Sequence, residues 1–115
     1  MANTFYSKAV YISGNGPIIG HSCPGSKRDL IKSINVNNES SINHRGSVYW
    51  NDGNNINIGK PTPYYPIRVS GEVLAFDVLR ATSDFFSLRA GDAIVFYNTS
   101  TGFLTATISY IEQDA

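Results

Sequence analysis

The sequence predicts an all-β protein: a single antiparallel β-sandwich, jelly-roll-like, with about eight short strands. Two observations support this class. Apolar and polar residues alternate with the two-residue period of half-buried strands, and clusters of Gly, Asn, Asp and Pro separate these stretches. No stretch of helical period competes, although residues 78–82 could form one helical turn. At 115 residues the chain fits one domain, residues 1–115.

The last predicted strand shows the alternation most clearly. Its expected core face consists of Leu104, Ala106, Ile108 and Tyr110, and the residues between them are Thr or Ser. An earlier strand alternates in the same way, with expected inner residues at Leu30, Ile34 and Val36. Further strands, rich in β-branched and aromatic residues, are predicted at Thr4–Ile12, Ser47–Asn51, Tyr65–Ser70, Glu72–Val78, Phe85–Leu88 and Ala93–Asn98.

Two local features refine this architecture. In the segment LRAGDA, Gly91 can take a positive φ at a tight turn, and the Asp92 side chain can accept a hydrogen bond from a turn amide. Val48 and Trp50 share one strand face, so Trp50 is expected in the core at the centre of the sandwich.

The charge composition predicts an assembled protein. Nine Lys plus Arg balance nine Asp plus Glu, and only 16% of the residues are charged, against the quarter or so that is usual for soluble domains. The balanced charge favours neither a nucleic acid nor a membrane as partner. No signal peptide or membrane span is visible, and the single cysteine, Cys23, fits a reducing compartment.

Candidate catalytic and metal-binding groups are few. A nucleophile and base could come only from Cys23 with His21 or His44, and nothing in their spacing suggests an oxyanion donor. His21 and Cys23 supply two donors where a zinc site usually needs four. We therefore expect no enzymatic activity, no metal and no cofactor.

Two kinds of binding surface remain as hypotheses. A glycan could stack on Tyr49 while Asn51 and Asp52 bind its hydroxyl groups. A protein partner could instead contact the proline-containing edge, which predicts an interface at Tyr64, Tyr65 and Arg68, together with His21 and Lys27 from a long first loop.

The order of motifs between Asp29 and Glu112 points to a known class. A strand of alternating apolar residues ends in Asn37, a V-x-W-x-D segment spans Val48–Asp52, an L-x-A-G-D corner spans Leu88–Asp92, and a closing S-Y-x-E strand spans Ser109–Glu112. With these motifs the chain resembles small β-sandwich virion structural proteins of tailed bacteriophages, of the decoration, neck and tail accessory type. The stretches from Gly14 to Lys27 and around the prolines are longer than in that pattern.

The resemblance implies a non-enzymatic virion structural protein, assembled in the cytoplasm of a bacterial host. A capsid decoration or cement protein is favoured, with a neck, tail or baseplate component as the alternative. The implied partners are the major capsid protein or neck and tail proteins, and a homo-oligomer, either a trimer or a ring, is expected. The alternative from another class is a carbohydrate-binding, lectin-like module for host recognition.

Overall fold

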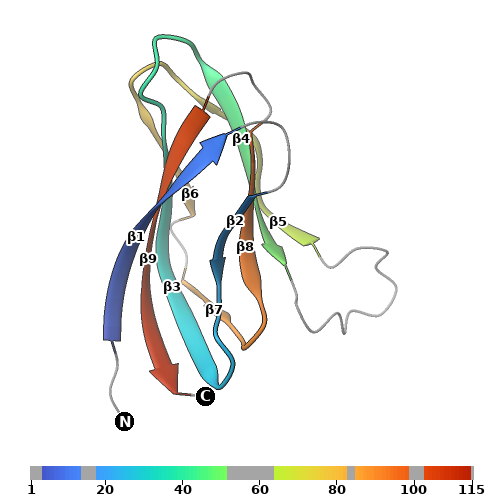
Figure 1. Cartoon of the computed structure of the whole chain (residues 1–115). Coiled ribbons are helices and arrows are strands. Elements are labelled where there is room, and N and C mark those ends of the chain that lie inside the picture. The colour runs from blue at the N-terminus through green and yellow to red at the C-terminus, as the bar shows by residue number, and fades with distance from the viewer. Residues whose placement is uncertain (1–3, 14–17, 52–63, 83–84, 99–102, 115) are drawn as a thin grey trace.

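The computed structural model describes residues 4–13, 18–51, 64–82, 85–98 and 103–114, and these form two antiparallel sheets packed face to face (Figure 1). The strands within these ranges are β1 (Thr4–Ser13), β2 (Ile18–Ser22), β3 (Lys27–Asn37), β4 (His44–Asn51), β5 (Tyr64–Val73), β6 (Val78–Thr82), β7 (Phe86–Leu88), β8 (Ala93–Asn98) and β9 (Phe103–Asp114).

The strand order pairs the first strand with the last. One sheet runs β1-β9-β3-β6, with β7 also paired to β3, and the other runs β2-β8-β4-β5. The prediction of an antiparallel β-sandwich is confirmed, whereas its jelly-roll-like connectivity stays a prediction. The described residues include no helix long and apolar enough to cross a membrane.

The core lies between the two sheets and follows the predicted alternation in β9. Its β9 members are Leu104, Ala106, Ile108 and Tyr110, all of them buried as expected. In β3 the prediction holds for Ile34 and Val36 but is wrong for Leu30, which is only half-buried, while Ile31 is fully buried. The β3–β9 register shifts between Ile31 and Ser33, and this bulge reverses which residues face inward.

Three segments differ from the sequence-based expectation. Residues 18–22 form β2 where a loop was expected, and Gly20 allows it to pack closely, because a Cβ added at this position would clash with the Phe96 ring. Residues 78–82 form strand β6 rather than a helical turn, because they pair with β3. The strands expected at Tyr65–Ser70 and Glu72–Val78 are one strand, β5, followed by a turn.

The corner before β8 behaves as its sequence predicts. Gly91 has a φ of 90°, and the Arg89 N–H donates to the Asp92 carboxylate at 3.1 Å. The corner is also bonded to the β2–β3 connection, because the Gly91 N–H donates to the Cys23 carbonyl and the Cys23 N–H donates to the Asp92 carbonyl. Trp50 packs against the core beside this corner but is only half-buried, so its expected place at the sandwich centre is wrong.

Candidate functional site

Two loops lie side by side at one end of the sandwich, at the top of Figure 1. One joins β3 to β4 through residues 38–43, and the other joins β5 to β6 through residues 74–77. The Phe76 N–H donates to the Ser40 carbonyl at 3.2 Å, and the Ala75 N–H donates to the Asn43 side chain at 2.9 Å. Residues 38–43 and 74–77, together with Val78 at the start of β6, are called the loop end below.

Asn38 organises the loop end from inside. Its side chain is buried, and Nδ2 donates to the carbonyls of Ile42 at 2.7 Å and Val73 at 3.0 Å. Its Oδ1 accepts from the backbone N–H of Ser40 at 2.9 Å and from the Ser40 hydroxyl at 2.8 Å. The buried Asn38 amide therefore holds the β3–β4 loop in place and bonds it to β5, the strand that leads into the β5–β6 loop.

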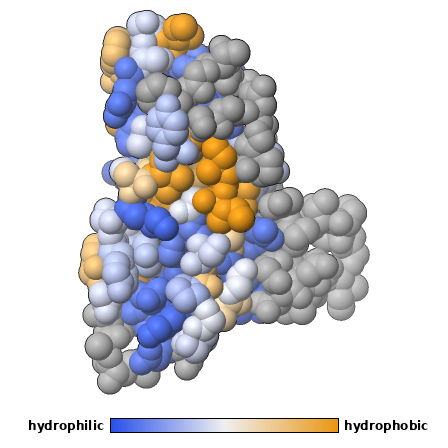
Figure 2. All heavy atoms as spheres, viewed as in Figure 1, coloured by the Kyte–Doolittle hydropathy of each residue, from blue (hydrophilic) through white to orange (hydrophobic). Residues whose placement is uncertain are grey.

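The loop end exposes large apolar side chains. Ile42 is 66% exposed, Leu74 49%, Phe76 73% and Val78 56%. Figure 2 shows orange and pale orange atoms at this end of the molecule. Phe76 has a φ of 57°, in the left-handed region that bulky side chains rarely adopt. Several large apolar side chains exposed on two hydrogen-bonded loops are typical of an interaction site.

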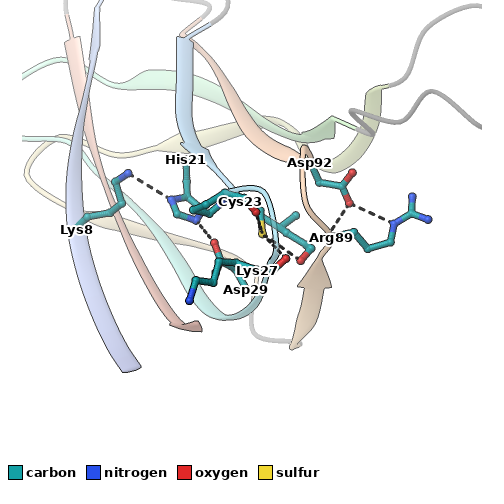
Figure 3. Close-up of polar contacts among 9 residues, drawn as sticks. Lys8, His21, Cys23, Lys27, Asp29, Arg89 and Asp92 are labelled. Carbon is teal, nitrogen blue, oxygen red and sulfur yellow. Dashed lines mark hydrogen bonds and ion pairs between the residues drawn. The ribbon is translucent and has the colours of Figure 1, made fainter. Parts of the chain in front are cut away.

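A second candidate site is a buried polar cluster at the opposite end, where β1, β2 and β3 bring together Lys8, His21 and Asp29 (Figure 3). The Lys8 ammonium can only donate, so it donates to Nδ1 of His21 at 3.3 Å. The proton of the His21 ring then lies on Nε2, which donates to Oδ2 of Asp29 at 2.5 Å. The three side chains form a continuous hydrogen-bonded chain.

The environment of His21 favours its neutral form. Burial lowers the pKa of His21 below 6.5, partly opposed by the hydrogen bond and charge of Asp29, and the Lys8 charge lowers it further. The imidazole also packs on the ring of Tyr110, with 4.2 Å between ring centroids. His21 thus acts as a neutral bridge between a cation and an anion.

Asp29 also faces Glu112, its cross-strand partner on β9. Partial burial, followed by the hydrogen bond and the negative charge of Asp29, raises the pKa of the Glu112 carboxyl. Among the described residues, Oδ1 of Asp29 is a buried oxygen without a partner of its own. The raised pKa favours the protonated Glu112 carboxyl, which is the form that can donate to a carboxylate.

Cys23 lies beside the cluster but is not a nucleophile in this setting. Burial, followed by the charge of Asp29, raises the pKa of the Cys23 thiol to about 11. Its Sγ–H faces the carbonyls of Lys27 at 3.4 Å and Leu88 at 3.5 Å. In the part of the chain that the structure describes, no three His, Cys, Asp or Glu side chains lie close enough together to hold a metal ion.

The predicted protein-interface residues lie on three strands, β2, β3 and β5. His21 is buried in β2, so its predicted place on an exposed first loop is wrong. Lys27 begins β3 and forms an ion pair with Asp114 at 2.6 Å, whereas Arg68 is exposed on β5. Tyr64 and Tyr65 belong to β5 and pair with β4, but their side chains lie outside the described part of the structure.

The predicted glycan contacts are described only in part. Tyr49 is half-buried, and its ring meets that of Tyr97 edge-on at 5.4 Å. Asn51 is half-buried at the end of β4, and Asp52 lies outside the described residues. Tyr97 was not among the predicted glycan contacts, and the structure places it against Tyr49.

Sequence reasoning missed the loop end. Ile42 is an isolated apolar residue in the polar stretch NNESSINH, and such isolation is the signal that could have revealed it. The exposure of Leu74 and Phe76 in a turn could not be predicted because the alternating segment Glu72–Val78 matched the pattern of a strand. The structure ends β5 at Val73 and turns the chain at Leu74–Asp77 instead.

No protein-family model, curated protein or solved structure gave a significant match to this chain. A function is therefore inferred from the β-sandwich, the loop end and the polar cluster.

Proposed function

We propose that this chain is a non-enzymatic structural protein of a bacteriophage virion, with capsid decoration or cement favoured over a neck, tail or baseplate component. The observation that carries the proposal is the amount of apolar surface left uncovered on a chain with few charges. Among the described residues, the large exposed apolar ones are Phe5, Tyr6, Tyr11, Ile19, Ile42, Leu74, Phe76, Val78 and Phe85. An assembled protein can bury such a surface against its neighbours.

These residues form more than one surface, as attachment within a lattice requires. Ile42, Leu74, Phe76 and Val78 belong to the loop end. Phe5 and Phe85 lie elsewhere, on either side of Lys32, whose ammonium is 5.0 Å and 5.7 Å from their ring centroids. A subunit with two separate contact surfaces can bind a scaffold through one and another copy through the other.

The strand order supports the jelly-roll form of the proposal. β1 lies beside β9 in one sheet and β2 beside β8 in the other, so the chain crosses repeatedly between the sheets. Jelly rolls are double sheets whose chain also crosses between the sheets, and they are frequent in viral capsid proteins, so this connectivity supports the proposal.

The groups best suited to catalysis are bonded within the chain. His21 bridges Lys8 and Asp29, and Cys23 is held as a thiol against backbone carbonyls. These contacts support a stabilising role for the polar cluster, and hence a binding protein rather than an enzyme.

The proposal includes a homo-oligomer, either a trimer on a capsid three-fold axis or a ring around the neck or tail. Its partners are the major capsid protein or the neck and tail proteins, and the particle is assembled in the host cytoplasm. Mass spectrometry of gradient-purified virions tests this directly. Hundreds of copies per particle indicate decoration and small ring-like numbers indicate a neck or tail component, whereas virions without the protein would refute the proposal.

A second candidate function, glycan binding, rests on the edge-on pair of Tyr49 and Tyr97 with Asn51 at the end of the same strand. A glycan array with the wild type and Asn51→Ala tests it. Selective binding at millimolar affinity or better that is lost in Asn51→Ala would displace the structural proposal. Binding that the variant retains would leave this surface without a role.

A further inference from the structure

The loop end is a rigid surface rather than a loose pair of loops. Besides the Asn38 contacts, Nε2 of buried His44 lies 3.1 Å from the Ser40 hydroxyl, and the Asn38 N–H donates to the Asp77 carbonyl at 2.9 Å. The exposed apolar side chains are thus attached to a backbone that is already ordered. Binding through such a surface loses little conformational entropy, which favours affinity.

Phe76 occupies the most constrained position of this surface. Its φ of 57° is held by its own N–H bond to Ser40 and by the Asp77 N–H, which donates to the Leu74 carbonyl at 3.0 Å. A large aromatic residue in this conformation gains nothing within the chain, because 73% of it is exposed. Backbone strain that the surroundings maintain is concentrated at binding sites.

The charges around the loop end specify its partner. In residues 38–44 and 73–78 the only Asp, Glu, Lys or Arg residues are Glu39 and Asp77, and both are exposed. The next charges along the chain are Arg45 and Glu72, which face each other at 3.7 Å and offset each other, and Arg80, which is exposed on β6 two residues after Val78. The two loops themselves thus carry only negative charge, which disfavours contact with an anionic bilayer and with the loop end of a second copy.

We propose that the loop end docks into an apolar groove of another protein whose rim carries Lys or Arg side chains. Phe76 and Ile42 enter the groove, and Glu39 and Asp77 pair with the rim. This inference rests on the proposed structural function and names the surface and the partner chemistry that it uses.

Site-specific photocrosslinking in the cells that produce the protein identifies the partner. A benzophenone amino acid replaces Phe76 in the full-length chain, and the same replacement at Phe85, also exposed but outside the loop end, is the control. We expect a product with a different protein from position 76 and none with that protein from position 85. Products only with another copy of this chain, or equal yields from both positions, would overturn the inference.

Binding measurements with the captured protein, once purified, then test the chemistry. Phe76→Ser and Ile42→Ser should each raise the Kd about tenfold, and Phe85→Ser should leave it within about twofold. Glu39→Gln combined with Asp77→Asn should raise the Kd several-fold and weaken its dependence on NaCl concentration. Circular dichroism confirms that each variant is folded. An unchanged Kd in either loop-end apolar variant, or an unchanged salt dependence in the double variant, contradicts the proposal.

Two further arms separate this inference from the proposed function. Cosedimentation with phosphatidylglycerol vesicles should give no binding, and binding that Phe76→Ser abolishes would assign the loop end to a membrane instead. If the captured partner is absent from purified virions but the Kd values behave as expected, the docking surface stands and the virion proposal fails. If the chain is present in virions but Phe76→Ser and Ile42→Ser bind the partner normally, the virion proposal stands and the docking surface fails.

Discussion

The indole N–H of Trp50 donates a hydrogen bond to the buried carboxylate of Asp92 at 3.2 Å, which links β4 to the corner before β8. The same carboxylate accepts from the Arg89 backbone and lies 3.7 Å from the Arg89 guanidinium. The V-x-W-x-D and L-x-A-G-D motifs, far apart in the sequence, therefore meet through Trp50 and Asp92. This structural contact explains why the two motifs occur together in the sequence.

Removing the Asp92 carboxylate should destabilise the chain strongly. Asp92→Ala leaves the Trp50 and Arg89 donors without their acceptor, which should lower the free energy of unfolding by about 2–4 kcal/mol. Urea denaturation measures the change. Trp50→Phe removes one of these bonds, and the double variant should show a coupling energy of about 1 kcal/mol. Strict additivity of the two single changes would mean that the bond contributes nothing.

The inner face of β9 should be sensitive to truncation. Leu104 and Ile108 are both fully buried, so replacing either with Ala should lower the free energy of unfolding by about 2–5 kcal/mol by leaving a cavity. Thr107→Ala, on the opposite face of the same strand, is the matched control and should change stability by less than about 0.5 kcal/mol. Equal effects at positions 107 and 108 would show that the assigned faces are wrong.

Regular alternation explains why the fold class and the β9 core face could be predicted from the sequence. The bulge in β3 could not, because a single inserted residue leaves no mark in the pattern yet moves Leu30 out of the core and Ile31 into it. The loop end could not be predicted either, since its shape depends on Asn38 bonding both to Ile42 in its own loop and to Val73, which is distant in the sequence on β5. The burial of His21 could not be predicted because its partners, Lys8 and Asp29, lie on β1 and β3, and only the fold brings these strands beside β2.

The lowered pKa of His21 should make stability fall in mild acid. The unfolded chain takes up a proton near pH 6.5, whereas the folded chain resists it because the ring is buried. The stabilising contribution is therefore complete above about pH 6.5 and is lost as the pH falls through the lower, folded pKa. His21→Gln removes the titrating group. The free energy of unfolding, measured from pH 7.5 to 5, should decrease less steeply in His21→Gln than in the wild type.

The pH dependence of stability that Glu112 contributes should be opposite to that of His21. Because its pKa is raised in the folded chain, its contribution is complete below the ordinary value of 4.5 and is lost as the pH rises through the folded pKa. Glu112→Gln places a permanent donor beside Asp29. We expect it to increase the free energy of unfolding by about 0.5–1 kcal/mol at pH 7, with a smaller gain at pH 4.5. Gln113→Glu, on the opposite face of β9, is the control, and a loss of stability in Glu112→Gln at pH 7 would contradict the raised pKa of Glu112.

Relieving the backbone strain at Phe76 should stabilise the chain but weaken docking through the loop end. Its φ of 57° is strained for a bulky residue, so Phe76→Gly should increase the free energy of unfolding by about 1 kcal/mol while weakening binding of the crosslinked partner. Ser26, with a φ of 64° in the β2–β3 turn, is the matched control. Ser26→Gly should stabilise the chain similarly and leave partner binding unchanged. Thermal unfolding and binding titrations on the same preparations separate the two effects, and a Phe76→Gly variant that binds as tightly as the wild type would show that the strained aromatic residue has no part in docking.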